Sequence, residues 1–258
     1  MAEAALRVER QGGVVRCTLD RPPLNLFEPG LIAAVRSTFV ALAADPSVRV
    51  VVLTGAGRAF TGGMDIHVLR DLDSERARVL ITTLHDAIDA VHRAPFPVVA
   101  AVNGAALGAG FELALACDLR IAAVEATLGL PEVLVGVPSV IQAALLPPLV
   151  GPGRAAELLL TGATVTAREA LGWGLVNRAV ERGELGAAVD ATVAAIVAAA
   201  PGAVRLQKEL IIRWRESDLT TAVRAGIAAF AASYASGEPR EGATAFLEKR
   251  RPRFEDLR

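Results

Sequence analysis

Residues 97–138, PVVAAVNGAALGAGFELALACDLRIAAVEATLGLPEVLVGVP, hold the most informative pattern in this chain. They begin as an apolar, β-branched run typical of a buried strand and break at Asn103-Gly104. A second turn, Gly108-Ala109-Gly110, comes just before a helical pattern from Phe111 to Cys117. A glycine turn between a buried strand and a helix presents free backbone N–H groups at the positive end of the helix dipole. This turn is therefore a candidate binding site for a negatively charged oxygen.

Two carboxylates, Glu112 and Glu132, stand in this stretch in otherwise apolar company. Burial in such surroundings raises a carboxyl pKa toward the range useful for proton transfer at neutral pH. Each has a simpler interpretation: Glu112 as a favourable charge in the first turn of a helix, and Glu132, after Pro131, as a surface turn residue. Their joint setting favours acid and base chemistry on a carbon acid beside a polarised carbonyl. Asp118 and Arg120 could pair locally, and a structural role is expected for both.

A second glycine loop, Gly62-Gly63, follows the apolar run 48–53 and leads into a helical pattern for which Asp65 is the expected N-cap. If parallel strands of one sheet carry both loops, the loops meet at the carboxyl-end edge of that sheet. The backbone N–H groups of Met64 and Ala109 would then converge on one oxygen and form an oxyanion hole. The alternative is that the glycines serve only to make turns.

The length of the chain and its hydrophobic pattern limit the possible fold classes. The chain has 258 residues, is 53% hydrophobic and carries a formal net charge of −1. Strand and helix patterns alternate, which predicts an α/β core over residues 1–195, and a helical region is expected over 196–258. Residues 185–200 and 204–234 are alanine-rich and helical in pattern. We expect the helices after Pro201 to bury their apolar faces between subunits.

Composition also argues against several classes of protein. The near-neutral charge gives no reason to expect a nucleic acid or an anionic membrane as partner. The polar N-terminus and the interrupted apolar runs favour a cytoplasmic protein without a membrane segment. The three histidines, His67, His85 and His92, have no clustered partners, and Cys17 and Cys117 are expected to be buried and reduced, so no metal site is predicted.

Several further segments complete a family pattern. They are residues 19–22 (LDRP), 59–66 (AFTGGMDI), 101–113 (AVNGAALGAGFEL), 117–118 (CD), 131–132 (PE), 160–162 (LTG), 173–176 (WGLV), 241–242 (EG) and 245–250 (AFLEKR). In this order and combination they resemble the enoyl-CoA hydratase/isomerase family of the crotonase superfamily, from near residue 5 to Phe254. The segments are highly specific for the family and much less specific for one reaction within it.

The resemblance implies a crotonase-like (ClpP/crotonase) fold of repeated ββα units, with a helical C-terminal region that packs homotrimers, often paired into homohexamers. It implies an acyl-CoA substrate whose thioester oxygen accepts hydrogen bonds from Met64 and Ala109. CoA is part of that substrate, so no separate cofactor is expected. Substrate contacts carried over from the family fall on Leu24, Gly62, Gly63, Asp65, Ile66, Gly108, Gly110 and Lys249.

The resemblance also implies roles for the two carboxylates. Glu112 matches the group that activates water for addition at C3 of a 2-enoyl thioester, and Glu132 matches the group that delivers a proton to C2. Isomerases of the family typically keep only the second carboxylate, so possession of both favours hydration. Isomerisation, another enolate reaction of a lyase or hydrolase, and a catalytically silent acyl-CoA-binding scaffold remain alternatives. Phe111, Leu130 and the loop from Pro138 differ from the residues common in hydratases, so the acyl group stays open.

Overall fold

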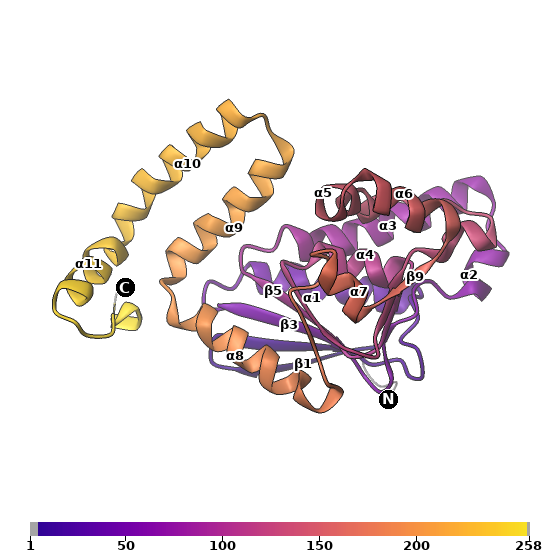
Figure 1. The fold of residues 1–258 in the computed structure, drawn as a ribbon, viewed down its shortest axis with the longest axis horizontal. Helices are drawn as coiled ribbons and strands as arrows, with labels where there is room; N and C mark the ends of the chain where they lie inside the picture. Colours follow the sequence, from indigo (N-terminus) through magenta and orange to yellow (C-terminus); the bar gives the residue numbers. More distant parts are fainter. Residues whose placement is uncertain (1–4, 257–258) are drawn as a thin grey trace.

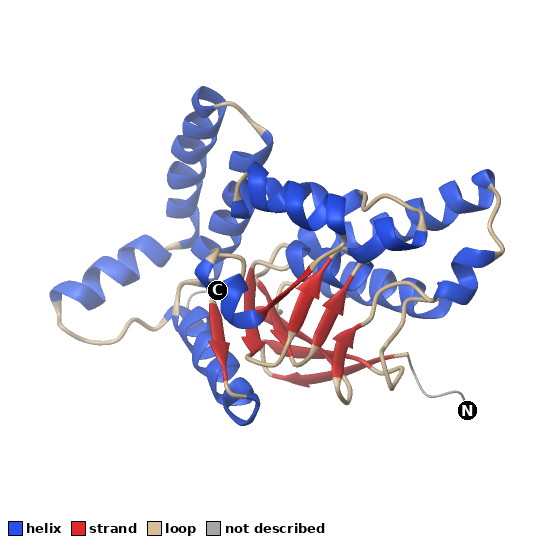
Figure 2. Cartoon of the chain, turned by 45° about the vertical axis from the view of Figure 1, so that its right-hand side comes forward, coloured by secondary structure: helices blue, strands red, loops and turns tan. Residues whose placement is uncertain are grey.

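A computed structural model describes residues 5–256, whose core contains two β-sheets covered by helices (Figures 1 and 2). The larger sheet has the order β1-β2-β3-β5-β7-β10. Its first two strands form an antiparallel hairpin, and the others run parallel to β2. The bounds of these strands are β1 (Leu6–Gln11), β2 (Val14–Leu19), β3 (Val50–Gly55), β5 (Val98–Val102), β7 (Leu119–Ala123) and β10 (Arg178–Val180).

The smaller sheet has the order β4-β6-β8-β9. Its strands are β4 (Ala59–Thr61), β6 (Ala105–Leu107), β8 (Thr127–Gly129) and β9 (Thr164–Thr166). The pairs β3–β4, β5–β6 and β7–β8 each give one strand to each sheet and then lead into helical structure. That structure is α2 (Ile66–Arg70) with α3 (Ser74–His92), then α4 (Ala109–Ala116), then the 3₁₀ helices η1 (Pro131–Val135) and η2 (Ile141–Leu145). The expected repeated ββα units are thus confirmed.

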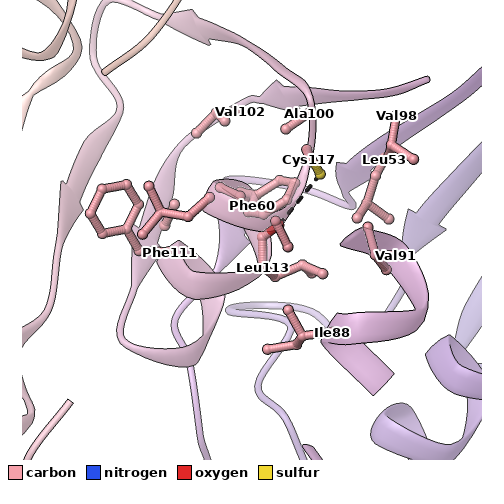
Figure 3. Close-up of a cluster of buried hydrophobic side chains, with 14 of the residues drawn as sticks. Leu53, Phe60, Ile88, Val91, Val98, Ala100, Val102, Phe111, Leu113 and Cys117 are labelled. Atoms are coloured by element: carbon pink, nitrogen blue, oxygen red, sulfur yellow. Dashed lines mark hydrogen bonds between the residues drawn. The ribbon is translucent and has the colours of Figure 1, made fainter. Parts of the chain in front are cut away.

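The central strands β3, β5 and β7 of the larger sheet are buried on both faces, and successive side chains of each strand point to opposite sides. In β3, Val51 and Leu53 join the core with α1 (Pro29–Ala43), α3 and α4, while Val50 and Val52 face α8 (Leu185–Ala198). Figure 3 shows part of the first core, including Leu53, Phe60 and Phe111, together with the Cys117 thiol, which donates to the carbonyl of Leu113. This layer fixes α4, the helix that carries Glu112, against the sheet.

Between η2 and α8 the chain forms short elements that complete the core. They are α5 (Leu146–Val150), α6 (Pro152–Thr161), α7 (Ala167–Gly172) and η3 (Arg182–Glu184). Arg120 is buried here, and its guanidinium donates to the carbonyls of Leu175, Ala114 and Cys117. The local pair of Asp118 with Arg120 does not form among the described residues. Because backbone carbonyls satisfy the buried arginine, the Asp118 carboxylate instead pairs with Lys208.

The C-terminal helices project away from the sheets (Figure 1). They are α9 (Pro201–Glu216), α10 (Leu219–Ser233), η4 (Tyr234–Ser236), α11 (Glu238–Leu247) and η5 (Phe254–Asp256). The helical pattern over 204–234 is divided, because the chain reverses at Ser217 and Asp218 caps α10 by accepting the Thr221 N–H. The expected boundary at 195 falls within α8, which packs on the larger sheet up to its last turn.

Within residues 5–256, no single helix has both the length and the apolar composition needed to cross a membrane. Residues 182–198 and 201–216 meet these requirements only together, as a pair bent by 109°.

Candidate active site

A cavity of about 970 Å³ opens at the ends of β4 and β6. Its walls come from α2 and α3 on one side and from η1 with the following loop on the other, and the glycine turns form its floor. Most of the lining is aliphatic: Ile66, Leu69, Leu72, Ala77, Leu80, Ile81, Leu84, Leu134, Val135, Val137 and Val140. The polar side chains are Asp73, Ser74 and Arg78 of the α3 end, together with Glu112 and Glu132. The cavity therefore combines an apolar surface with two carboxylates.

The two glycine loops lie side by side because their strands are parallel neighbours. β4 pairs with β6, so Gly63 and Gly108 leave the sheet at the same edge. Gly63 has φ +90°, and a Cβ there would lie 2.5 Å from the carbonyl oxygen of Leu107 and 3.5 Å from the nitrogen of Ala109. Only glycine fits this left-handed, crowded position. Its absence of a side chain brings the backbone at Met64 next to the start of α4.

The N–H groups of Met64 and Ala109 have no acceptor within the described part of the chain, residues 5–256. Their neighbours are satisfied: Gly63 N–H donates to Thr61 Oγ1 at 3.1 Å, and Gly108 N–H donates to the carbonyl of Gly129 at 2.9 Å. Ala109 is also the first residue of α4, where the helix dipole adds positive potential. The two remaining donors suit an oxygen that gains negative charge during a reaction.

Glu112 lies in the first turn of α4 and is only 2% exposed. Its Oε1 accepts a hydrogen bond from the N–H of Ala143 at 3.1 Å. Burial raises the pKa of Glu112 to about 8, with a smaller rise from the negative charge of Glu132, while the backbone donors of Ala143 and Val140 oppose it. The side chain can therefore hold or release a proton near neutral pH.

Glu132 reaches the same floor from the opposite wall. It is half-buried in η1, and the hydroxyl of Ser139 donates to its Oε2 at 2.7 Å. A Cβ at Gly108, where φ is +54°, would lie 2.9 Å from its Oε1. The carboxylate is thus packed against the turn that precedes Ala109. The arrangement puts two carboxyl groups and two N–H donors around one space.

Eight of the expected site residues line this cavity: Gly62, Gly63, Met64, Ile66, Gly108, Ala109, Glu112 and Glu132. Leu24, Asp65 and Gly110 are absent from its wall and support it from behind. The Leu24 carbonyl accepts the Gly62 N–H at 2.8 Å, and Asp65 is the N-cap of α2, accepting the His67 N–H at 2.9 Å. A Cβ at Gly110 would lie 2.5 Å from the Thr61 carbonyl oxygen.

Lys249 lies outside the cavity. It is exposed just beyond α11, on the C-terminal helices that project from the core. Among residues 5–256 it does not line the cavity, and its role in substrate binding stays a prediction.

Sequence reasoning missed three groups that shape the site. Ser139 holds Glu132, Ala143 donates to Glu112, and Arg78 stands at the rim on α3. Ser139 follows Pro138 in the loop that differs from common hydratases, which is the one available signal. A backbone donor such as Ala143 leaves no trace in the sequence, because every residue except proline has an N–H.

The histidines lie apart from one another, and within the described ranges no group of three or more His, Cys, Asp or Glu side chains gathers as it would around a metal ion. His85 on α3 approaches Gln142 of η2, and His92 approaches the carbonyl of Ala116.

Comparison with known proteins places this geometry in a family. The profile of the enoyl-CoA hydratase/isomerase family matches residues 9–257. A crotonyl-CoA hydratase of Syntrophomonas wolfei is 35% identical over 98% of this chain and 99% of its own. A putative enoyl-CoA hydratase of Thermus thermophilus is 39% identical over 96% of this chain and all of its own. The chain belongs to the enoyl-CoA hydratase/isomerase family.

Solved structures agree with this placement. The crystal structure of an enoyl-CoA hydratase from Mycobacterium smegmatis has a TM-score of 0.95 and 37% identity, with 98% of this chain and 100% of that chain covered. The crotonase-like fold expected from the sequence is confirmed.

Proposed function

We propose that the protein is a 2-enoyl-CoA hydratase, which adds water across the double bond of an enoyl-CoA thioester. The observation that carries this proposal is the meeting of Glu112, Glu132 and the free N–H groups of Met64 and Ala109 around one largely apolar cavity. The names of the full-length relatives support the same reaction class.

The proposed reaction begins with the thioester carbonyl oxygen accepting hydrogen bonds from Met64 and Ala109. In the reactive form of the pair the single proton lies on Glu132, although burial favours the protonated form of Glu112. Ionised Glu112 takes a proton from water as the water oxygen bonds to C3, and the electron pair of the double bond moves toward the carbonyl as an enolate. Protonated Glu132 then gives its proton to C2 and restores the carbonyl. Glu112 ends protonated and Glu132 ionised, so the pair carries one proton before and after each turnover.

The chemistry requires no group beyond these side chains and the thioester. Acyl-CoA suits the cavity because its acyl part can contact the aliphatic wall while its thioester lies over the two donors. We therefore propose that activity needs no added cofactor or metal, and turnover after dialysis against EDTA checks this.

The direct experiment follows the loss of enoyl-thioester absorbance for a series of 2-enoyl-CoA esters. Glu112→Gln and Glu132→Gln should each lower kcat by roughly 10²–10⁴-fold, because each removes one proton-transfer group. Glu209→Gln, an exposed residue on α9, is the matched control and should leave kcat unchanged.

The outcomes separate hydration from its competitors. A severe loss in Glu132→Gln with a mild one in Glu112→Gln, together with migration of a double bond, would indicate isomerisation. Binding of acyl-CoA by calorimetry without conversion of any ester would indicate a silent scaffold. Wild-type rates in both variants would rule out the proposed mechanism.

A further inference from the structure

Gln142 is an unusual residue for its place in the core. It lies in η2, is 6% exposed, and its Oε1 has no hydrogen-bond partner within residues 5–256. An unpaired buried carbonyl destabilises a protein, and an apolar side chain of similar size would avoid that cost. A glutamine here therefore needs an explanation other than packing.

The amide nitrogen of Gln142 provides an explanation for the presence of a glutamine. It lies 3.2 Å from Nδ1 of His85, a half-buried residue of α3. The Gln142 amide donates to Nδ1 in the ring tautomer that carries its proton on Nε2. The bond ties η2 to α3, the helix that forms one wall of the cavity.

The segment held by this bond is strained and carries the donor to Glu112. Ile141, just before Gln142, has φ +26°, a conformation that β-branched residues rarely adopt. Such a conformation persists only where surrounding contacts enforce it. Ala143, just after Gln142, donates its N–H to Glu112 Oε1 at 3.1 Å.

We propose that His85 and Gln142 are positioning residues for the Glu112 carboxylate: their hydrogen bond holds η2 so that the Ala143 N–H stays on Glu112. The inference deepens the proposed hydratase function and rests on it for its catalytic meaning. The bond itself joins residues of this chain and can be tested without substrate.

The test without substrate is a carboxyl titration by NMR on protein labelled with carbon-13 at glutamate side-chain carboxyls, with Glu112→Gln used to assign the Glu112 signal. Gln142→Met keeps the length of the side chain and removes the bond to His85. Loss of a well-aimed N–H should move the Glu112 midpoint upward by about half a pH unit or more. Among the described residues, the titratable groups facing this region are Glu132 from η1 and His85 from α3.

Controls separate positioning from folding. Gln207→Met on the exposed side of α9 should leave the Glu112 midpoint unchanged. Gln142→Met should keep or raise thermal stability, because it removes an unpaired buried oxygen. His85→Ala should raise the midpoint by the same amount, and the double variant should show no further rise, since both changes break one bond.

Activity supplies the second measurement. With a 2-enoyl-CoA ester that the wild type hydrates, Gln142→Met should lower kcat roughly 10-fold while KM changes less than about 2-fold, because the acyl wall is intact. An unchanged Glu112 midpoint in Gln142→Met overturns the positioning proposal, whether or not the protein proves to be a hydratase. A raised midpoint in a protein that hydrates no ester supports the proposal and refutes the hydratase function alone.

Discussion

At the scale of single residues, the behaviour of Glu112 follows from its burial. An unpaired carboxylate in an apolar setting is energetically unfavourable, so burial favours the protonated form of Glu112 and raises its pKa to about 8. The Ala143 N–H stabilises the ionised form and opposes this rise. Glu132 is half-buried and has the Ser139 hydroxyl as donor. The two carboxyl groups thus line the same cavity but have different surroundings. This difference suits a pair in which one group accepts a proton and the other donates one.

The first prediction concerns the pH dependence of turnover. Because the proposed active form carries one proton on the Glu112–Glu132 pair, kcat/KM should fall above about pH 8 as that proton is lost. Hydration and dehydration must fall in parallel, since their ratio is an equilibrium constant without net proton exchange. Initial rates in both directions from pH 6 to 10, corrected for spontaneous thioester hydrolysis, check this. A rate that climbs through pH 8 would contradict the one-proton form.

A second prediction at this scale concerns stability. The pKa of Glu112 is raised from 4.5 to about 8 on folding, so the folded state binds the proton more tightly than the unfolded chain does. Wild-type stability is therefore full below about pH 4.5 and declines as pH rises to about 8. Glu112→Gln should lack this decline, gaining up to roughly 4 kcal/mol relative to wild type between pH 5 and 9.

Denaturant unfolding of both proteins across this pH range measures the difference. Glu209→Gln reports any general effect of removing a surface carboxylate. If the free energies of unfolding of wild type and Glu112→Gln changed with pH in the same way, the raised pKa of Glu112 would be contradicted.

At the scale of elements, the parallel pairing of β4 and β6 creates the candidate oxyanion hole. The two strands end together, and each is followed by a glycine with positive φ, Gly63 and Gly108. Neither loop alone positions two donors. The pairing of short strands in the smaller sheet is what sets the separation between the Met64 and Ala109 backbones.

The third prediction uses Gly63→Ala to test whether activity depends on the closeness of the Met64 and Ala109 backbones. Its methyl group would meet the Leu107 carbonyl at 2.5 Å, which forces the Met64 N–H away from Ala109. Because one misplaced donor costs roughly 10²–10³-fold in rate, kcat should drop by that order. Gly57→Ala is the matched control: it also has positive φ, at +70°, but its methyl group would meet no atom within 4 Å.

Steady-state kinetics and thermal melts of both variants separate the two effects. Both should lose about 1–2 kcal/mol of stability through backbone strain. Gly63→Ala should lose more than that because its methyl group meets the Leu107 carbonyl, and only Gly63→Ala should lose turnover. Equal activities in the two variants would show that the Met64 donor is not used.

The docking of α9 is a second feature of this scale. Lys208 is buried against the core, and its Nζ donates to Asp118 Oδ1 at 2.6 Å, while Asp118 Oδ2 accepts the Val98 N–H at 2.8 Å. Arg205 adds a bond to the Val48 carbonyl at 2.7 Å. These polar contacts join a helix of the C-terminal region to the start of β5 and to the residue just before β7.

The fourth prediction is that Lys208→Met destabilises the protein by about 1–3 kcal/mol, because it leaves the mostly buried Asp118 carboxylate without its cation. Lys249→Met, the same substitution at an exposed site, should change stability by less than about 0.5 kcal/mol. Chemical unfolding at neutral pH measures both. A Lys208→Met protein as stable as wild type would mean that packing alone holds α9.

At the scale of the whole molecule, the C-terminal helices expose an apolar stripe. Along α10 and into η4 the exposed side chains Leu219, Val223, Ile227, Phe230 and Tyr234 recur at helical spacing. Phe230 is 69% exposed, and Phe246 and Leu247 at the end of α11 are more exposed still. We propose that this surface is covered by further copies of the chain in a homotrimer or homohexamer, since a continuous stripe of this kind is rarely left in water.

The fifth prediction concerns that assembly. Light scattering of the wild type should give a mass of about three or six times the 26.8 kDa of one chain. Ile227→Glu with Phe230→Glu should lower that mass, because both charges would be buried in the interface. Arg224→Glu, an exposed polar position on the same helix, is the control. A monomeric wild type would refute the proposal.

Much of the core was predictable from local patterns. The apolar run 48–53 overlaps β3, and the run that opens residues 97–138 contains β5; the side chains of these strands are buried on both faces. The reversal at Ser217 was not predicted, because helical patterns lie on both sides of it and indicate one continuous segment. Asp218 caps α10 at the break, and α10 packs on α9. The Asp118 partner was missed for a similar reason: Lys208 is distant in the sequence and adjacent only after folding.

The same division holds for the site. Residue types and their spacing can be read directly from the sequence. The glycine turns, the two glutamates and their apolar neighbours could therefore be named as candidate site residues from the sequence alone. Which of them share a space depends on strand pairing and helix packing over long sequence distances. The structure thus brought Met64 beside Ala109, placed Glu132 against Gly108 and supplied the Ala143 N–H to Glu112. The glycine turns pointed to the N–H groups of Met64 and Ala109, but no residue type marks the Ala143 N–H, and for that reason only the tertiary structure could identify it.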